Sequence, residues 1–299
     1  MAESVLTRSD RVHVQTRTLL EGIHAYERVA LIYFCYLAAL GLFRPVPAPH
    51  RVALFAVPLF ICVLIRLEIP ASRPWSRVAR QWVSLALILV AYWLLGWFAA
   101  APLGKVEATW AAWDARLLND YGLKHAVEAA GWIGPSVIET CYLLVYAIPP
   151  LSLGLVYACG ERPRANRFLT ILFLGTLTAY ALLPLVPIVS PRLAFPANDP
   201  PAFHGVAHRI NTFLLDRYDI STGVFPSGHV AVAFSSALGL FSVLRERRWI
   251  WPLSFLMAFL VYVDTIYGRY HYAVDGLASI CVVLMVWGVN RGWRANEVP

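Results

Sequence analysis

Charge is scarce in this chain, and lysine is almost missing from it. Only 14% of the 299 residues are charged, two of them are lysines, and 59% of the chain is hydrophobic. Ordinary soluble domains carry roughly 25% charged residues. The composition therefore excludes an ordinary soluble fold and predicts an all-α, polytopic integral membrane protein.

A polar linker, a cysteine framework and a cleavable signal peptide are missing as well. Short charged joints separate the apolar runs, so we expect one membrane domain. The five cysteines all lie within apolar runs, where they pack as small hydrophobic residues. Residues 1–28 hold four arginines but no signal-type hydrophobic core, so an uncleaved N-terminus is expected.

Long apolar runs are what the chain does have. A spanning helix needs roughly 20 mostly apolar residues, or fewer where the bilayer thins around it. Eight runs meet this requirement, and the first two are short. Their approximate ranges are 29–43, 51–66, 82–101, 137–158, 168–190, 229–244, 249–267 and 272–290.

The basic residues between these runs predict the topology. With the N-terminus inside, the inner segments carry 16 of the 25 Lys and Arg residues, although the outer segments are longer. This asymmetry predicts cytoplasmic N- and C-termini, with segments 102–136 and 191–228 outside the cell membrane. Because topology accounts for the net charge of +7, we expect a membrane lipid as partner and no nucleic acid. The sequence does not indicate an oligomeric state.

This topology brings four polar residues to one level of the membrane. Arg192 follows the fifth run outward, His229 opens the sixth, and Arg269 and His271 precede the eighth. Ionisable groups at the ends of membrane helices are expensive to place and are therefore candidates for function. We expect all four at the outer rim.

His271 and Asp275 are spaced for an oriented nucleophile. They are four positions apart, so both side chains lie on the same face of a helix. A carboxylate that bonds one imidazole nitrogen fixes the tautomer and leaves the other nitrogen free to attack. An unpaired carboxylate in such an apolar run would be costly, which favours this pairing.

The segment Phe225-Pro226-Ser227-Gly228-His229 predicts the start of a helix. Free amide groups at a helix N-terminus bind anions. We expect Ser227 to cap the helix and also to donate a hydrogen bond to phosphate, while Gly228 lets the backbone approach a ligand closely. His229 is then placed to protonate a leaving alkoxide, while Arg192 and Arg269 hold the phosphate oxygens. Phosphoryl transfer depends mainly on positioning and electrostatics, so these parts suffice without a metal or a cofactor.

These motifs resemble those of the phosphatidic acid phosphatase type 2 superfamily. Pro226 to His229 matches its second motif, and Arg269, His271 and Asp275 match its third. The resemblance implies that His271 attacks phosphorus to form a phosphohistidine, that Asp275 orients it, and that His229 protonates the leaving group. It also implies a six-helix catalytic core at 82–290, after an N-terminal segment with two extra helices at 1–81 and before a cytoplasmic tail at 291–299.

Two departures from the family pattern point to one branch. The first motif of the family has a Lys seven residues before Arg-Pro, whereas this chain has Leu185 and then Pro191-Arg192. Arg269 also lies two residues before the histidine, where the family places its arginine six before. Both features are similar to the inositol phosphorylceramide synthase-like branch, whose members transfer a phosphoryl head group to an alcohol.

Other polar residues have weaker functional interpretations. His204 and His208 are spaced for a metal, but no third ligand is evident. Glu139 and Asp264 are expected to make structural contacts between helices. The remaining candidates lie in the outer loop, where they either read a head group or form a solvated face: Arg209, Asp216, Arg217 and Asp219.

Three functions therefore remain open from the sequence. A phosphotransferase passes the phosphoryl group to an alcohol, whereas a lipid phosphatase passes it to water, and both share the first half-reaction. A transporter also has many spans and intramembrane polar residues. The polar residues here cluster at one rim, which favours an enzyme over a transporter.

Overall fold

The computed structural model describes residues 23–66 and 74–295, so residues 1–22, 67–73 and 296–299 of the predicted inner segments lie outside the described part. Within that part the chain is all-α, as predicted. Its only β-type pairing is an isolated parallel bridge between Ile188 and Gly223.

Each of the eight predicted runs contains a helix. They correspond to α2 (Ala25–Phe43), α3 (Ala48–Arg66), α4 (Pro74–Leu95), α7 (Ile133–Leu143) with α8 (Ile148–Ala158), α9 (Ala165–Leu182), α12 (Gly228–Val243), α13 (Ile250–Tyr267) and α14 (Ala273–Ala295). Five of these helices in the described chain are long and apolar enough to cross a membrane, or six if the bent α7–α8 pair counts as one span. The apolar part of α3, Ala48–Val63, and helix α12 are shorter than the helices that could span.

The fourth predicted span is broken rather than straight. Its two halves, α7 and α8, meet at an angle of 75° after a 3₁₀ turn, η3 (Leu144–Tyr146). Pro149 and Pro150 stand in the first turn of α8, where proline is accepted but cannot continue the hydrogen bonding of a preceding helix. The bend places Tyr142 and Tyr146 beside the start of α12.

Helices α9 and α12 form the centre of the bundle. Most of α9 is buried, and α12 packs against α9, α13, α14 and α8. Small residues allow this close packing: a Cβ on Gly175 would lie 2.1 Å from the Ser235 hydroxyl, and one on Gly239 would lie 2.7 Å from the Phe168 ring. The start of α12, which carries His229, is therefore held in the core.

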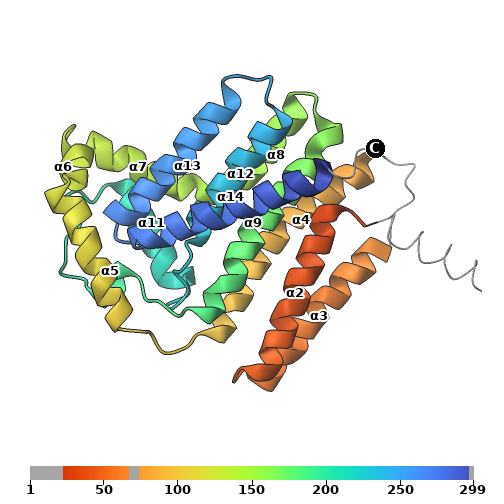
Figure 1. The fold of residues 1–299 in the computed structure, drawn as a ribbon, viewed down its shortest axis with the longest axis horizontal. Helices are drawn as coiled ribbons and strands as arrows, with labels where there is room; N and C mark the ends of the chain where they lie inside the picture. Colours follow the sequence, from red (N-terminus) through yellow and green to blue (C-terminus); the bar gives the residue numbers. More distant parts are fainter. Residues whose placement is uncertain (1–22, 67–73, 296–299) are drawn as a thin grey trace, which may run out of the picture.

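Helices α2 and α3 form a hairpin at the side of this bundle (Figure 1). Helix α2 packs on α9, where the Tyr36 hydroxyl donates to the Ala181 carbonyl at 2.7 Å. Arg80 of α4 donates to both carboxylate oxygens of Glu27, at 2.5 and 2.7 Å, and ties the hairpin to α4.

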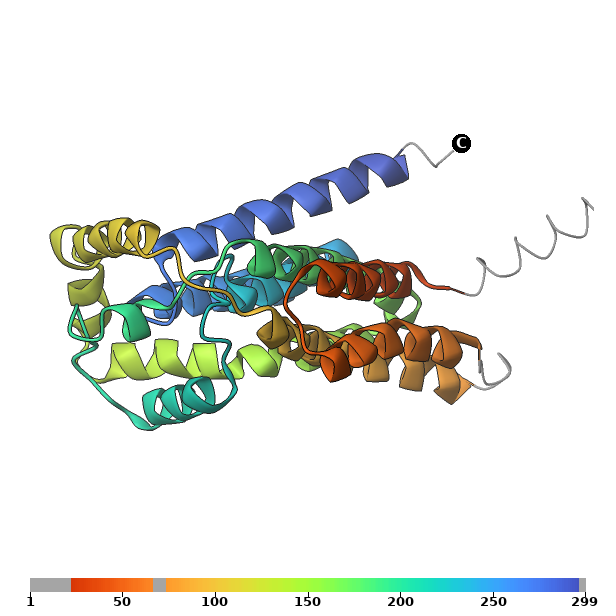
Figure 2. The same ribbon diagram turned by 90° about the horizontal axis from the view of Figure 1, so that it is seen from below.

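The predicted outer segments gather at one end of the molecule. Helices α5 (Lys105–Ala115), α6 (Leu123–Glu128), α10 (Pro191–Ala194) and α11 (Val206–Tyr218) lie at the end opposite the C-terminal end of α14 (Figures 1 and 2). Short turns complete the fold: η1 (Gly96–Phe98), a π-helical turn η2 (Arg116–Asp120), η4 (Arg162–Arg164) and η5 (Leu183–Leu185). Both long polar segments thus converge on the start of α14.

Candidate active site

A tight turn between α13 and α14 presents His271. Arg269 adopts a left-handed conformation with φ of 61°, which reverses the chain. The His271 amide then donates to the Thr265 carbonyl at 2.9 Å, which ties the turn to the last part of α13. The His271 side chain is only 6% exposed, so its ring is held by the surrounding protein.

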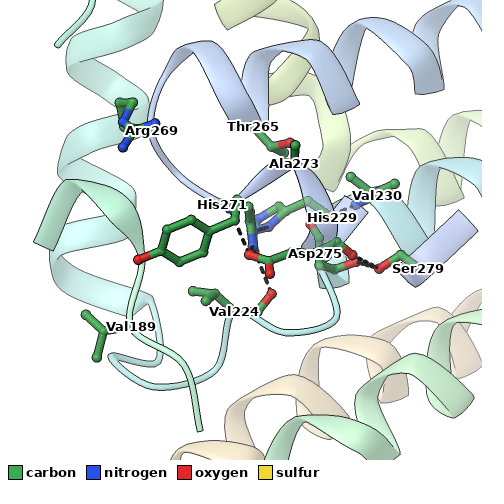
Figure 3. A network of polar contacts seen from close by, with 12 residues as sticks. Val189, Val224, His229, Val230, Thr265, Arg269, His271, Ala273, Asp275 and Ser279 are labelled. Carbon is green, nitrogen blue, oxygen red and sulfur yellow. Dashed lines mark hydrogen bonds and ion pairs between the residues drawn. The ribbon is translucent and has the colours of Figure 1, made fainter. Parts of the chain in front are cut away.

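The two nitrogens of the His271 ring have different neighbours. Nδ1 lies 3.0 Å from the Val224 carbonyl and 3.5 Å from Oδ2 of Asp275, while Nε2 faces Nδ1 of His229 at 3.4 Å (Figure 3). The expected contact between the imidazole and the carboxylate is present, but the carbonyl is the nearer acceptor. With the proton held on Nδ1, the lone pair of Nε2 points toward His229.

Asp275 also organises the start of its own helix. Its Oδ2 accepts a hydrogen bond from the Tyr272 amide at 2.9 Å, and the side chain is fully buried. This is the arrangement of a carboxylate near a helix N-terminus, where it satisfies a free amide. One carboxylate thus supports both the helix and the imidazole.

His229 is positioned by the first turn of α12. The Ser227 hydroxyl caps the helix by accepting from the Val230 amide at 3.4 Å, as predicted for the cap, and this hydroxyl is buried. At Gly228, a Cβ would lie 2.8 Å from the Tyr180 ring, so packing against that ring requires a glycine. His229 follows directly and points toward His271.

Two tyrosines that the sequence interpretation missed flank His229. The Tyr146 hydroxyl lies 3.3 Å from Nε2, and the Tyr142 hydroxyl lies 3.4 Å from Nδ1. Both come from the bend between α7 and α8, more than 80 residues earlier in the chain. Because they sit within an apolar run with other aromatic residues, no local signal distinguishes them.

Hydrogen bonds join the starts of α12 and α14. The Ser227 amide donates to the Asp275 carbonyl at 3.1 Å, and the Ser279 hydroxyl lies 2.8 Å from the Ser227 carbonyl and 3.0 Å from that of Asp275. Ser279 is also a residue that the motifs do not mark. These bonds fix the register of the two helices that carry the histidines.

Arg269 is not directed at the histidines. Its guanidinium group is buried and points away from the imidazoles (Figure 3), with Nη1 3.5 Å from Oδ2 of Asp114. Asp114 belongs to α5, and its Oδ1 accepts from the Ala273 amide at 3.1 Å. The two-arginine clamp expected at the phosphate is therefore not formed by Arg269 as placed here.

Asp114 is a further residue that the motifs did not reveal. Burial raises the pKa of its carboxyl to about 7, and the Ala273 amide and the Arg269 charge only partly oppose this rise. It holds the start of α14 and the arginine of the third motif at the same time. The outer segment 102–136 is thus connected to the site.

Arg192 lies between the turn of Arg269 and helix α11. Its amide donates to the Arg269 carbonyl at 3.0 Å. Its Nη1 lies 2.5 Å from the exposed carboxylate of Asp216, and its Nη2 lies 4.0 Å from the carboxylate of Asp219, whose side chain is 12% exposed. Of the two arginines, Arg192 is the one with a neighbour, Asp219, whose carboxyl is close enough to His271 to be affected by a charge on its ring.

Two cavities adjoin these residues. An apolar pocket of about 290 Å³ is lined by α4, α8, α9 and α12 and ends at Gly228 and His229. A second cavity of about 250 Å³ is lined by the loop after α10 and by Arg192, His208 and Arg269, among others. The apolar pocket reaches His229, whereas the second cavity is lined by both arginines.

Three other polar candidates, His204, His208 and Glu139, form a separate cluster. His208 Nδ1 lies 2.7 Å from Glu139, which also accepts from the Tyr270 hydroxyl at 2.9 Å, and the His204 ring stacks on that of His208. Among the described residues, no group of three His, Cys, Asp or Glu side chains is arranged around a common metal position. Glu139 makes the interhelical contacts expected of it.

Spanning helices and a pair of histidines beside an apolar pocket are features of a membrane enzyme. Sequence comparison identifies the family. Residues 108–289 match the model of the PAP2 superfamily. This match covers more than half of the chain, so the chain belongs to the PAP2 superfamily.

One curated relative is a PA-phosphatase related-family protein from Dictyostelium discoideum. It is 33% identical over 111 residues, an alignment that covers 32% of this chain and 20% of the relative. This chain thus spans about a fifth of the length of that relative. The comparison with solved structures gave no match.

Proposed function

We propose that this protein is a membrane lipid phosphotransferase that works through a phosphohistidine on His271. One observation carries the proposal: Nδ1 of His271 is held by the Val224 carbonyl beside Asp275, while Nε2 faces His229 at 3.4 Å. A buried imidazole with one nitrogen anchored and the other facing a second imidazole is a nucleophile next to an acid. Membership of a superfamily of phosphatases and phosphotransferases supports this assignment.

The first half-reaction forms the covalent intermediate. His271 Nε2 attacks phosphorus, the bond from phosphorus to the lipid oxygen breaks, and protonated His229 gives its proton to that oxygen. The positive charge that develops on the His271 ring is stabilised by the carboxylate of Asp275. Because the two rings are in contact in the structure, the His229 ring must move aside to admit the phosphoryl group.

The second half-reaction reverses these roles. An acceptor hydroxyl loses its proton to His229, its oxygen forms a bond to phosphorus, and the bond from phosphorus to His271 breaks. We propose an alcohol as acceptor, because the spacing of Arg269 and His271 resembles the inositol phosphorylceramide synthase-like branch. Water in the same place makes the protein a lipid phosphate phosphatase, as the name of its PA-phosphatase related relative suggests.

The apolar pocket supports a lipid substrate. It is lined mainly by Leu, Ile, Val, Pro and Tyr side chains of the spanning helices and ends at His229. An acyl or prenyl chain that enters between these helices brings its head group to the histidines. Burial of the chain in such a pocket supplies binding without any charged contact.

We further propose that the site faces the extracytoplasmic side of the plasma membrane, with both termini in the cytoplasm. The distribution of basic residues supports this orientation. Residues 82–290 then form the catalytic core, and the α2–α3 hairpin of segment 1–81 is an addition at its side.

A turnover assay tests the proposal. The purified protein is incubated with phosphatidic acid, a polyprenyl phosphate or a phosphodiester lipid in the presence of EDTA. The release of phosphate and the formation of new lipids are then measured. We expect turnover of at least one lipid, and a loss of roughly a thousandfold or more in His271→Ala. His204→Ala, an outer histidine that does not contact the pair, serves as control and retains activity.

Three outcomes would contradict the proposal. Turnover retained in His271→Ala excludes the nucleophile, and complete loss with EDTA excludes the metal-free mechanism. Phosphate release without any transfer product, with alcohols present, excludes the transferase and leaves the phosphatase.

A further inference from the structure

Asp219 is a partly buried carboxylate that no motif includes. It follows the last residue of α11, and its amide donates to the Leu215 carbonyl at 3.1 Å. The side chain accepts a short hydrogen bond from the Tyr92 hydroxyl and lies 4.0 Å from Nη2 of Arg192. Helix α4, α10 and α11 thus meet at this one carboxylate.

These contacts place Asp219 at the edge of the histidine site. Tyr92 lines the apolar pocket together with His229 and Tyr146. Asp219 is also close enough to His271 for a charge on that ring to act on its carboxyl. Because Asp219 contacts both Arg192 and Tyr92, a phosphoryl group bound between the histidines and Arg192 lies near this carboxylate.

Charge is the property that Asp219 brings to this position. Burial raises the pKa of the carboxyl, and the Tyr92 hydroxyl, the His271 ring, the Arg192 charge and the Ile220 amide oppose the rise. A carboxylate beside a bound phosphoryl group repels it, and in a partly buried site the repulsion is stronger than in water. A phosphate monoester carries between one and two charges near neutral pH, since its second pKa is about 6, whereas a phosphodiester carries one.

We propose that Asp219 determines donor specificity by excluding doubly charged phosphate monoesters and admitting singly charged phosphodiester lipids. This inference rests on the proposed function, because it concerns the phosphoryl donor of the same site. It assigns Asp219 a role in selecting the donor and leaves bond formation and proton transfer to the histidines.

Asp216 offers a matched control. It also contacts the Arg192 guanidinium, at 2.5 Å, but its side chain is 58% exposed and does not line the apolar pocket. Removing the Asp216 charge takes away one ionic partner of Arg192 and leaves the Asp219 carboxylate, which is the charge proposed to lie next to the bound phosphoryl group, in place. An effect transmitted only through Arg192 would therefore arise in both variants.

The experiment compares two lipids with the same leaving group. Phosphatidic acid and phosphatidylmethanol with identical acyl chains differ by one methyl group and one charge, and diacylglycerol release gives kcat/KM for each. We expect Asp219→Asn to raise the ratio of monoester to diester kcat/KM by about tenfold or more. The ratio stays within about twofold of wild type in Asp216→Asn and in Asp219→Glu, which retains the charge.

A second variant keeps the test decisive if Asp219→Asn folds poorly. Asp219→Ser also removes the charge, and its smaller hydroxyl keeps a polar group facing the Tyr92 hydroxyl, so the ratio rises as in Asp219→Asn. An unchanged ratio in Asp219→Asn, or an equal rise in Asp216→Asn, overturns the inference. These outcomes differ from failure of the proposed function, which is no release from either lipid or release undiminished in His271→Ala.

Discussion

The His271 ring has a polar contact at each nitrogen, and the two contacts differ in kind. Nδ1 lies near a carbonyl and a carboxylate, both of which accept hydrogen bonds, whereas Nε2 faces another imidazole. An imidazole so placed keeps its proton on Nδ1 in the resting state. The Val224 carbonyl and the Asp275 carboxylate occupy the Nδ1 side of the ring, so Nε2 is the nitrogen that can attack phosphorus.

The charge of Asp275 is testable separately from its hydrogen bonds. Asp275→Asn retains an oxygen that can accept from the Tyr272 amide but removes the charge that stabilises the His271 cation. We expect kcat to fall roughly a hundredfold or more, as for other carboxylates that support a catalytic histidine. Steady-state kinetics measure this effect. A variant with wild-type kcat would show that the Val224 carbonyl alone positions the ring.

Asp114 predicts a dependence of stability on pH. Its pKa is about 7 in the folded protein and 3.8 as the ordinary value. Between these values the folded state keeps a proton that the unfolded state loses, so the stability that protonation provides is complete below about pH 4 and is lost as the pH rises through 7. Asp114→Asn does not titrate, and we expect its thermal stability to change less between pH 5 and pH 8 than that of wild type.

Thermal unfolding in detergent at a series of pH values provides this measurement. The expected difference in pH dependence is on the order of a few kcal/mol at most. Asp216→Asn, whose carboxylate is exposed, serves as control and follows the wild-type curve. If Asp114→Asn shows the same slope as wild type, Asp114 is ionised in the folded protein over the whole range.

At the scale of elements, the start of α12 and the start of α14 behave as one unit. The Ser279 hydroxyl contacts the carbonyls of Ser227 and Asp275, which precede and follow the two histidines in the chain. We expect Ser279→Ala to cost about 1 kcal/mol of stability and to lower kcat several-fold, because the two rings lose their fixed separation.

Thermal unfolding and kinetics on the same preparation check this prediction. Ser254→Ala is the control, since the Ser254 hydroxyl bonds only within its own helical turn, to the Trp251 carbonyl at 2.8 Å. Equal effects of the two substitutions on kcat would indicate a general loss of stability and no role for the connection between helices.

The elements that local patterns define were predictable, and those that depend on distant contacts were not. The spacing of His271 and Asp275 and the cap at Ser227 follow from one helical turn each, so the sequence indicated them. Tyr142 and Tyr146 reach His229 only because a span breaks by 75° at their position. A hydropathy pattern shows an apolar run there and contains no information about the bend.

The direction of Arg269 illustrates the same limit. Its motif position suggested a phosphate ligand, but a left-handed turn and a carboxylate 155 positions earlier in the chain, Asp114, hold the side chain on the other side of the loop. Neither feature is visible in the motif. The family resemblance suggested candidate residues and could not supply the orientation of their side chains.

At the scale of the whole molecule, the polar helices and the site share one end. Helix α10, which carries Leu193, lies at that end, and Trp249 lies between the predicted inner joint 245–248 and α13. In a variant without the five native cysteines, Leu193→Cys is expected to react with a membrane-impermeant maleimide on intact cells, whereas Trp249→Cys reacts only after lysis. Both positions are exposed, at 49% and 83%. The opposite labelling pattern would invert the topology.

The central claim is that His271 carries the phosphoryl group during turnover. The most direct measurement is a rapid quench of enzyme mixed with a lipid donor labelled in its phosphoryl group, followed by peptide mapping of the labelled residue. The account predicts an acid-labile, base-stable label on His271 in the wild-type protein and none in His271→Ala. Turnover without a labelled enzyme, or a label on another residue, would contradict it.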